Sequence, residues 1–233
     1  MQKRTAAAMV AAVVAMWSLG WVLGSSAGAE NPGAALVVPR ITDPPEVPVP
    51  ATGTGRDPLT PAETDRAREL ALAGLATAGP AGPTDVTGAA GPELLTVRRA
   101  DGDGSARRAD VLAYDYRGDK LVKVAVDLTA GRVTGTFAAA GMQPPATPRE
   151  VATAVDLLWR HDLGELMRER FRQATGAAPA SAAELEPGAQ TYTGKPCAVH
   201  RCVLLLLHRP GEPYVDLTDL VVDLSAGTVV RLP

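Results

Sequence analysis

The segment PCAVHRCVLLLLHRP, residues 196–210, carries the side chains best suited to chemistry in this sequence. Cys197 and Cys202 are the only cysteines among the 233 residues, and His200 and His208 are two of the three histidines. In an oxidising compartment an even pair of cysteines is typically joined as a disulfide. Four residues lie between these two cysteines, which suits a bridge across a turn between strands. The sequence therefore predicts a disulfide between Cys197 and Cys202.

The same side chains offer a metal site as an alternative. Thiolate and imidazole ligands together suit Cu(I) and Zn²⁺, so Cys197, His200, Cys202 and His208 are candidate ligands of a copper carrier. Their spacing matches no familiar metal motif, and a disulfide would consume both thiols. The sequence favours the disulfide, with no cofactor bound.

No familiar catalytic motif accompanies these residues. The sequence lacks G-x-S-x-G, S-x-x-K and H-E-x-x-H, and it has no glycine-rich phosphate loop. His161 stands beside Asp162 inside a predicted long helix that continues to Phe171, and such a pair is more often a surface charge pair than a general base. The formal net charge of −3 also lacks the basic excess of nucleic-acid-binding proteins. We therefore expect a protein that is not an enzyme and binds no nucleic acid.

Residues 1–29 have the character of an export signal. Lys3 and Arg4 precede an apolar stretch, residues 5–24, and Ala27-Gly28-Ala29 offers a cleavage site. The apolar stretch is also long enough for a membrane-spanning helix, so a cleaved signal peptide and a retained anchor both stay open. A twin-arginine signal has little support, because Lys3 and Arg4 are not an Arg-Arg pair. In either case we expect the rest of the chain outside the cytoplasm, secreted or membrane-anchored.

A linker and two repeated segments follow the leader. Residues 30–57 are rich in proline and show no helical or alternating apolar pattern. Prolines remove amide donors and favour extended backbone, so this stretch is predicted to be a semi-rigid linker. The remainder divides into residues 58–145 and residues 146–233, which share one order of sequence signals.

Each segment begins with the same helix signal, TPAE in the first and TPRE in the second. In this pattern Thr caps the helix, Pro occupies the first turn, and Glu reaches back to the amide of Thr. Thr60 with Glu63, and Thr147 with Glu150, are therefore the predicted helix caps.

Each segment ends with a similar strand and turn. VDLTAG at 126–131 reappears as VDLSAG at 222–227. Apolar residues alternate ahead of the turn, which predicts a strand with one buried face. The letters Thr/Ser-Ala-Gly fit a three-residue hairpin loop in which Gly131 or Gly227 takes a positive φ. Each segment is thus predicted to be an α+β module, a helix packed on an antiparallel meander sheet.

DPLTPAE, followed by a helix and then by YDYRGDKLVKVAVDLTAGRV, resembles the small N-terminal modules of copper amine oxidases. Those modules are cystatin-like α+β domains, and exported PepSY-type domains are similar to them. The tandem also resembles uncharacterised exported actinobacterial proteins, often labelled as Tat pathway signal proteins. The resemblance implies two repeated cystatin-like modules with a binding or accessory role.

The resemblance does not imply oxidase activity. Copper amine oxidases make their cofactor from a tyrosine in an Asn-Tyr-(Asp/Glu)-Tyr setting, and they bind copper through three histidines, two of them as His-x-His. Here Asn31 is the only asparagine and is followed by Pro32, and no His-x-His pair occurs. The catalytic apparatus of that family is absent from this sequence.

These observations predict an exported, non-catalytic binding or accessory protein of the cell envelope, whose partner is an unknown protein or envelope ligand. The alternatives are an envelope copper carrier and a protease-inhibitor-like accessory domain. Residues 202–207 are apolar at both odd and even positions, so both faces of that strand need cover. We expect the cover to come from within the tandem, with an exposed binding surface as the alternative.

The turn assignment predicts the effect of adding a side chain at either hairpin glycine. Gly131→Val or Gly227→Val should destabilise its module by about 1 kcal/mol or more, because a branched side chain disfavours left-handed backbone. Thermal melting of each variant checks this prediction. Unchanged melting of both variants would remove the turn assignment.

Overall fold

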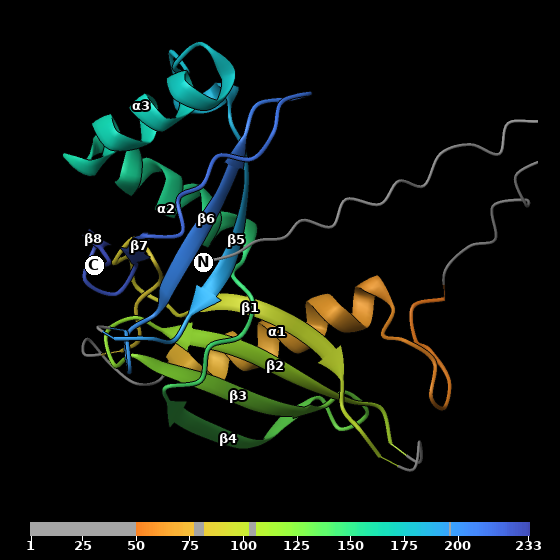
Figure 1. The fold of residues 1–233 in the computed structure, drawn as a ribbon. Helices are drawn as coiled ribbons and strands as arrows, with labels where there is room; N and C mark the ends of the chain where they lie inside the picture. The colour runs from red at the N-terminus through yellow and green to blue at the C-terminus, as the bar shows by residue number, and fades with distance from the viewer. Residues whose placement is uncertain (1–49, 77–81, 103–105, 196) are drawn as a thin grey trace, which may run out of the picture. The chain divides into compact units, whose positions relative to one another are not determined.

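Two antiparallel sheets and the helices that cover them make up the residues described by the computed structural model, 50–76, 82–102, 106–195 and 197–233 (Figure 1). Within these residues there are two four-stranded sheets and three α-helices, which confirms the α+β class. In chain order the elements are α1 (Pro61–Ala76), β1 (Glu93–Arg99), β2 (Arg108–Asp115), β3 (Lys120–Asp127), β4 (Arg132–Ala140), α2 (Pro148–Arg160), α3 (Leu163–Thr175), the 3₁₀ turn η1 (Ala182–Glu184), β5 (Glu186–Tyr192), β6 (Cys202–His208), β7 (Leu220–Asp223) and β8 (Thr228–Arg231).

Each sheet is a meander in which every strand pairs with the next one along the chain. The orders are β1-β2-β3-β4 and β5-β6-β7-β8. The predicted leader, its apolar stretch 5–24 and the linker up to residue 49 lie outside the described residues. In the part of the chain that is described, no helix has the length and apolar character needed to cross a membrane.

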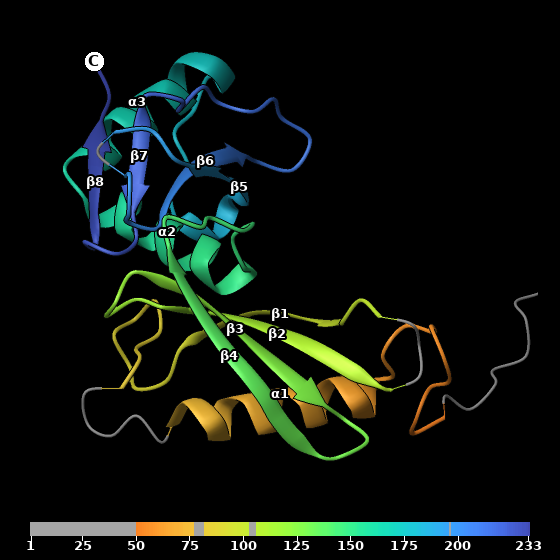
Figure 2. The ribbon, with the colours of Figure 1, turned by 90° about the horizontal axis from the view of Figure 1, so that it is seen from below.

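Helix α1 covers one face of the first sheet (Figure 2). Ala67 and Ala71 are fully buried on this helix, and they pack with valines of β2 and β3. Val111 of β2 pairs with Val124 of β3, so the two side chains share one face of the sheet. Small residues on the helix let its backbone approach the branched side chains closely. The alternation predicted for the strand before VDLTAG therefore places its valines in this core.

Helices α2 and α3 cover one face of the second sheet. Leu158 of α2 and Phe171 of α3 are almost completely buried, and they share a core with Val203 and Val222. The same core includes Tyr116, which belongs to the first of the two predicted modules. The apolar cores of the two predicted modules are therefore continuous at this point.

The long helix predicted through His161 is wrong, because the chain breaks there into α2 and α3. Gly164 explains how the two helices meet. A Cβ atom at Gly164 would lie 2.6 Å from the carbonyl oxygen of Leu158 and 2.9 Å from that of Trp159. Only glycine lets the start of α3 fold back against the end of α2 at this distance.

Both faces of β6 are covered within the second sheet's own unit. Val203, Leu205 and Leu207 face the helices, as part of the core described above. Cys202 belongs to a separate buried cluster with Cys197 and Val221, and the partly buried Leu204 packs against it. The cover predicted from within the tandem is therefore supplied by the segment that leads into β6.

The two hairpins at the ends of the repeats have the same geometry. Asp127 pairs with Arg132, and Asp223 pairs with Thr228, so each loop has four residues instead of the three predicted. Gly131 and Gly227 close these loops, both with φ +64°. Each aspartate accepts a hydrogen bond from an amide inside its own loop, at 2.8 Å in the first hairpin and 2.9 Å in the second.

Two helical glycines should respond in opposite ways to alanine. Gly164→Ala should destabilise the protein by about 1–3 kcal/mol, because the added methyl group meets backbone oxygens. Gly74→Ala in α1 is the matched control, since its Cβ would lie 3.5 Å from Val133, an ordinary contact. That change should be neutral or stabilising by about 0.5–1 kcal/mol, as expected inside a helix. Urea denaturation followed by circular dichroism measures both, and equal effects would contradict the account of the helix corner.

Candidate functional site

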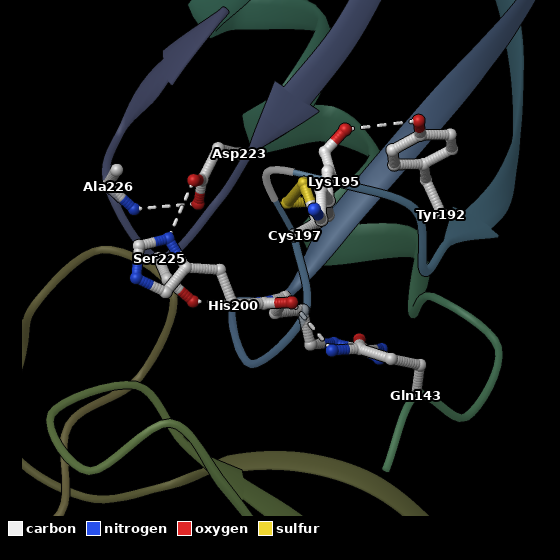
Figure 3. The surroundings of a disulfide bond; sticks show 10 residues. Gln143, Tyr192, Lys195, Cys197, His200, Asp223, Ser225 and Ala226 are labelled. Atoms are coloured by element: carbon white, nitrogen blue, oxygen red, sulfur yellow. Dashed lines mark hydrogen bonds and ion pairs between the residues drawn. A yellow bond between two sulfur atoms is a disulfide. The ribbon is translucent and has the colours of Figure 1, made fainter. Parts of the chain in front are cut away.

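The disulfide lies in the segment that connects β5 to β6 (Figure 3). The Sγ atoms of Cys197 and Cys202 are 2.09 Å apart, and their Cα atoms are 6.0 Å apart. Both residues are buried. The amide of Cys197 donates to the carbonyl of Gly194, and the Tyr192 hydroxyl donates to the carbonyl of Lys195. The crosslinked loop is therefore held at its start by its own backbone.

His200 and Asp223 meet beside the disulfide. His200 Nδ1 lies 2.7 Å from Asp223 Oδ2, while Asp223 Oδ1 accepts the turn hydrogen bond from the Ala226 amide (Figure 3). Asp223 is buried and the side chain of His200 is 38% exposed. The hydrogen bond to Asp223 raises the pKa of His200 above its ordinary value. This pair joins the disulfide loop to the end of β7.

The four metal ligands predicted from the sequence are not brought together. The two thiols are joined in the disulfide, and His208 lies at the opposite end of β6 from Cys202. There the His208 ring meets the Tyr214 ring edge to face, at a centroid distance of 4.4 Å. In place of His208, the structure brings a carboxylate oxygen of Asp223 to within 4.8 Å of both sulfur atoms.

A buried ion pair anchors the start of α2. Glu150 and Arg201 both have side chains that are 0% exposed. Arg201 donates from Nε to Glu150 Oε1 at 2.6 Å and from Nη2 to Oε2 at 2.8 Å. It also donates to the carbonyls of Pro144 and Pro145, at 2.8 and 3.1 Å, and its guanidinium carbon lies 5.3 Å from the centre of the Tyr114 ring. All three nitrogens of this guanidinium group thus donate hydrogen bonds within the protein.

Glu150 also makes the predicted capping box with Thr147. The Glu150 amide donates to the Thr147 hydroxyl, and the Thr147 amide donates to Glu150 Oε2 at 2.7 Å. Burial opposes the negative charge on this carboxylate, but the hydrogen bonds from Arg201 hold the pKa of Glu150 below its ordinary value. The carboxylate is therefore charged at neutral pH, and it stabilises the start of α2 and the position of Arg201.

The first module contains the same arrangement. Arg107 donates to Glu63 through two hydrogen bonds, at 2.9 and 2.5 Å. Glu63 forms a reciprocal capping pair with Thr60, at 3.1 and 2.9 Å. Arg107 also donates to the carbonyl of Asp57, at 2.9 Å. The hydrogen bonds from Arg107 lower the pKa of Glu63 to about 2.

We call this pattern the Arg–Glu clamp, meaning Glu63 with Arg107 and Glu150 with Arg201. Sequence reasoning found both glutamates as caps but missed both arginines. The available signal was positional, since each arginine stands shortly before the second strand of its sheet, at Arg107 and Arg201. Each arginine carbonyl also accepts an amide from the residue that follows VD in the repeat, Leu128 or Leu224, at 2.9 Å.

Charged and polar groups also connect the two predicted modules. The Tyr116 hydroxyl donates to Glu150 Oε1 at 2.6 Å. Arg149 lies 2.5 Å from Asp85 and 3.5 Å from Glu93. Burial raises the pKa of Tyr116, and the neighbouring Glu150 carboxylate adds to the effect. The clamp of the second module is thus tied directly to the first.

His161, the remaining candidate for catalysis, has a local role at the helix corner. It follows α2 as its C-cap, and its Nδ1 accepts a hydrogen bond from the Leu163 amide at 3.2 Å. The interaction helps the chain turn from α2 into α3.

An apolar surface lies at the outer strand of the first sheet. Strand β4 pairs with β3, and its residues 136–140 are all exposed. Phe137, Met142 and Val199 are large apolar side chains that are 60%, 54% and 51% exposed. The Gln143 side chain donates to the His200 carbonyl at 2.6 Å, which brings the segment after β4 beside the disulfide loop. We call β4 together with Met142 and Val199 the β4-edge surface.

Comparisons with known proteins find matches among solved structures only. No family model and no curated protein matches the chain. Among solved structures 29 chains match. One is a copper-containing benzylamine oxidase from Hansenula polymorpha, with 15% identity and a TM-score of 0.49 over 77% of this chain. The match spans only 30% of that oxidase, and no conclusion about function is drawn from it.

Removing one arginine of the clamp should be far more costly than removing a surface arginine. Arg201→Met should lower the free energy of unfolding by about 3–5 kcal/mol, because Glu150 stays buried without its counter-charge. Arg160→Met is the matched control, since Arg160 pairs with Asp156 on the exposed face of α2. The control should change stability by about 0.5 kcal/mol or less. Urea denaturation measures both variants, and similar losses would contradict a structural role for the clamp.

Proposed function

We propose that the chain is an exported, non-catalytic binding protein of the cell envelope, built from two repeated cystatin-like modules, residues 58–145 and 146–233. We further propose that it binds an extended segment of a partner protein along β4. The observation that carries this proposal is the edge position of β4, which among the described strands pairs with β3 alone.

The repeat itself is supported by matching contacts. Both segments have a Thr–Glu capping pair, an arginine that binds the capping glutamate, and a four-residue hairpin closed by glycine. These contacts occur in the same order along the chain. Independent evolution of the same clamp in two unrelated units is a less economical account than duplication of one module.

The non-catalytic proposal is supported by how the two clamp glutamates, Glu63 and Glu150, are used. General acid–base catalysis needs a group whose pKa lies near the working pH. The pKa values of Glu63 and Glu150 are lowered, and each carboxylate is held by an arginine and by a helix cap. These carboxylates are fixed in the charged form and are poorly placed to exchange protons with a substrate.

Strand β4 has the properties of a site for strand addition. An edge strand offers unpaired amide and carbonyl groups to any extended chain that reaches it. Proteins commonly protect such edges with lysine, proline or inward-facing charges. The sequence of β4, RVTGTFAAA, contains neither lysine nor proline, and its one charge, Arg132, stands at the start.

The side chains around this edge define the partner's chemistry. Phe137 stands on the strand, and Met142 and Val199 lie beyond its end. Lys123 of β3 places its ammonium nitrogen 5.3 Å from the centre of the Phe137 ring, so one charge borders the apolar side chains. Apolar patches of this kind mark interaction sites more often than they mark plain surface. We therefore expect a partner segment that is extended and carries apolar side chains.

Site-specific crosslinking tests the proposal in the full chain. A photoreactive phenylalanine analogue at position 137 should crosslink to an envelope protein, with the attachment mapped to an extended segment. The same analogue in place of Tyr214, which is 64% exposed, is the matched control and should not capture that segment. Hydrogen exchange should then show slower exchange of the β4 amides in the complex.

Two results would count against this function. Equal crosslinking from positions 137 and 214 would show that the β4-edge surface is not selective. Turnover of a substrate by the purified chain, with no partner captured, would show that the protein is an enzyme.

A further inference from the structure

We propose that reduction of the Cys197–Cys202 disulfide creates a buried binding site for a thiophilic divalent metal ion, with Asp223 as the third protein ligand. This inference does not rest on the proposed function, because it concerns the buried cysteines and Asp223, although the exposed Val199 of the same loop belongs to the β4-edge surface. It also differs from the ligand set that the sequence offered as an alternative to the disulfide, since Asp223 is the third ligand and neither His200 nor His208 binds the ion.

The distances suit a metal ion. Both Sγ atoms and a carboxylate oxygen of Asp223 lie within 4.8 Å of one another. Around tetrahedral zinc, with bonds of about 2.0–2.3 Å, ligand atoms are separated by roughly 3.3–3.8 Å. Once the sulfur–sulfur bond is broken, side-chain movements of about 1 Å bring the three atoms to these separations. All three residues are buried, so few waters compete for the ion.

The carboxylate is already oriented for this role. Asp223 Oδ1 is used by the amide of Ala226, whereas Oδ2 faces His200 at 2.7 Å. Carboxylates that bind metal ions are commonly held in place by hydrogen bonds from neighbouring groups. His200 is therefore a positioning residue, and a solvent molecule completes the coordination of the ion.

The first module shows that the fold does not require the cysteines. Arg107 is followed by Arg108, whereas the corresponding Arg201 is followed by Cys202. Asp127 makes the same turn hydrogen bond as Asp223, at 2.8 Å. The clamp and the hairpin thus form in the first module with no sulfur atom nearby, so the cysteine pair is an addition to the second module.

A dithiol is the reductant that opens the Cys197–Cys202 disulfide in this proposal. The dithiol supplies two electrons and two protons to the sulfur–sulfur bond, which gives two cysteine thiols and leaves the reductant as its own disulfide. A divalent ion then displaces the two thiol protons and binds two thiolates and one carboxylate. This mixed set of sulfur and carboxylate ligands suits Zn²⁺ better than Cu(I), because a hard carboxylate oxygen is a poor ligand for the soft Cu(I) ion.

Metal titration of the full chain tests the proposal. Reduced protein, freed of reductant under anaerobic conditions, should bind one Cd²⁺ per chain and develop thiolate-to-metal absorption in the ultraviolet. Zn²⁺ should displace the Cd²⁺. Oxidised protein should bind none at this site.

Substitutions separate the proposed ligands from the turn. Asp223→Asn keeps an oxygen for the Ala226 amide but should weaken Cd²⁺ binding at least tenfold. Asp127→Asn, the matched change in the first module, should leave binding unchanged. His200→Gln should weaken binding by about 10–100-fold, as loss of a positioning hydrogen bond does.

Three outcomes would overturn the proposal. These are no Cd²⁺ bound by reduced protein, equal binding by the Asp223→Asn and Asp127→Asn variants, and loss of the folded state on reduction. The last would show by circular dichroism that the disulfide is a requirement of the fold. Crosslinking from position 137 of the oxidised chain gives a separate readout, so failure of the metal site does not decide the proposed function.

Discussion

The start of α2 depends on a charge that has no access to water. Glu150 is fully buried, so its carboxylate must find all of its partners within the protein. It finds them in Arg201, in the amide of Thr147 and in the hydroxyl of Tyr116. These partners come from the residue before β6, from the helix cap and from the turn after β2. One carboxylate therefore fixes the positions of three segments that are far apart in the sequence.

The buried Arg–Glu pair of the first module also shows where the predicted linker ends. Residues 30–57 have the composition of a spacer, and the described structure begins only at residue 50. The guanidinium group of Arg107 has only hydrogen-bond donors, and besides Glu63 it uses the carbonyls of Gly55, Asp57 and Pro58. The last residues of the predicted linker thus belong to the folded module. Pro144 and Pro145, the last residues before the second module, have the same place beside Arg201.

Local signals in the sequence were enough to predict the helix caps, the strands and the turns. They were not enough to predict which residues contact one another across the fold. The capping letters, the alternating valines and the hairpin glycines each act within a few residues, so Thr147, Val124 and Gly131 could be assigned correctly by type. Arg107 and Arg201 bind glutamates that are 44 and 51 residues away, and no spacing rule connects such positions. The helix break was missed because the apolar stripe continues past His161. The deciding contact, that of Gly164 with the carbonyls of α2, is tertiary.

The two modules differ in what covers the face of the sheet that the helices leave open. In the second, the crosslinked loop before β6 packs Cys197 and Cys202 against Val221, so the strands are covered on both sides. In the first, β4 ends in five consecutive exposed residues and presents Phe137 to solvent. Burying apolar surface stabilises a protein by roughly 25 cal/mol for each Å² removed from water. The second module gains this free energy within the chain, whereas the described part of the first module retains exposed apolar side chains on and after β4. The difference between the two modules therefore arises in the segment that leads into the second strand, which carries cysteines in the second module and none in the first.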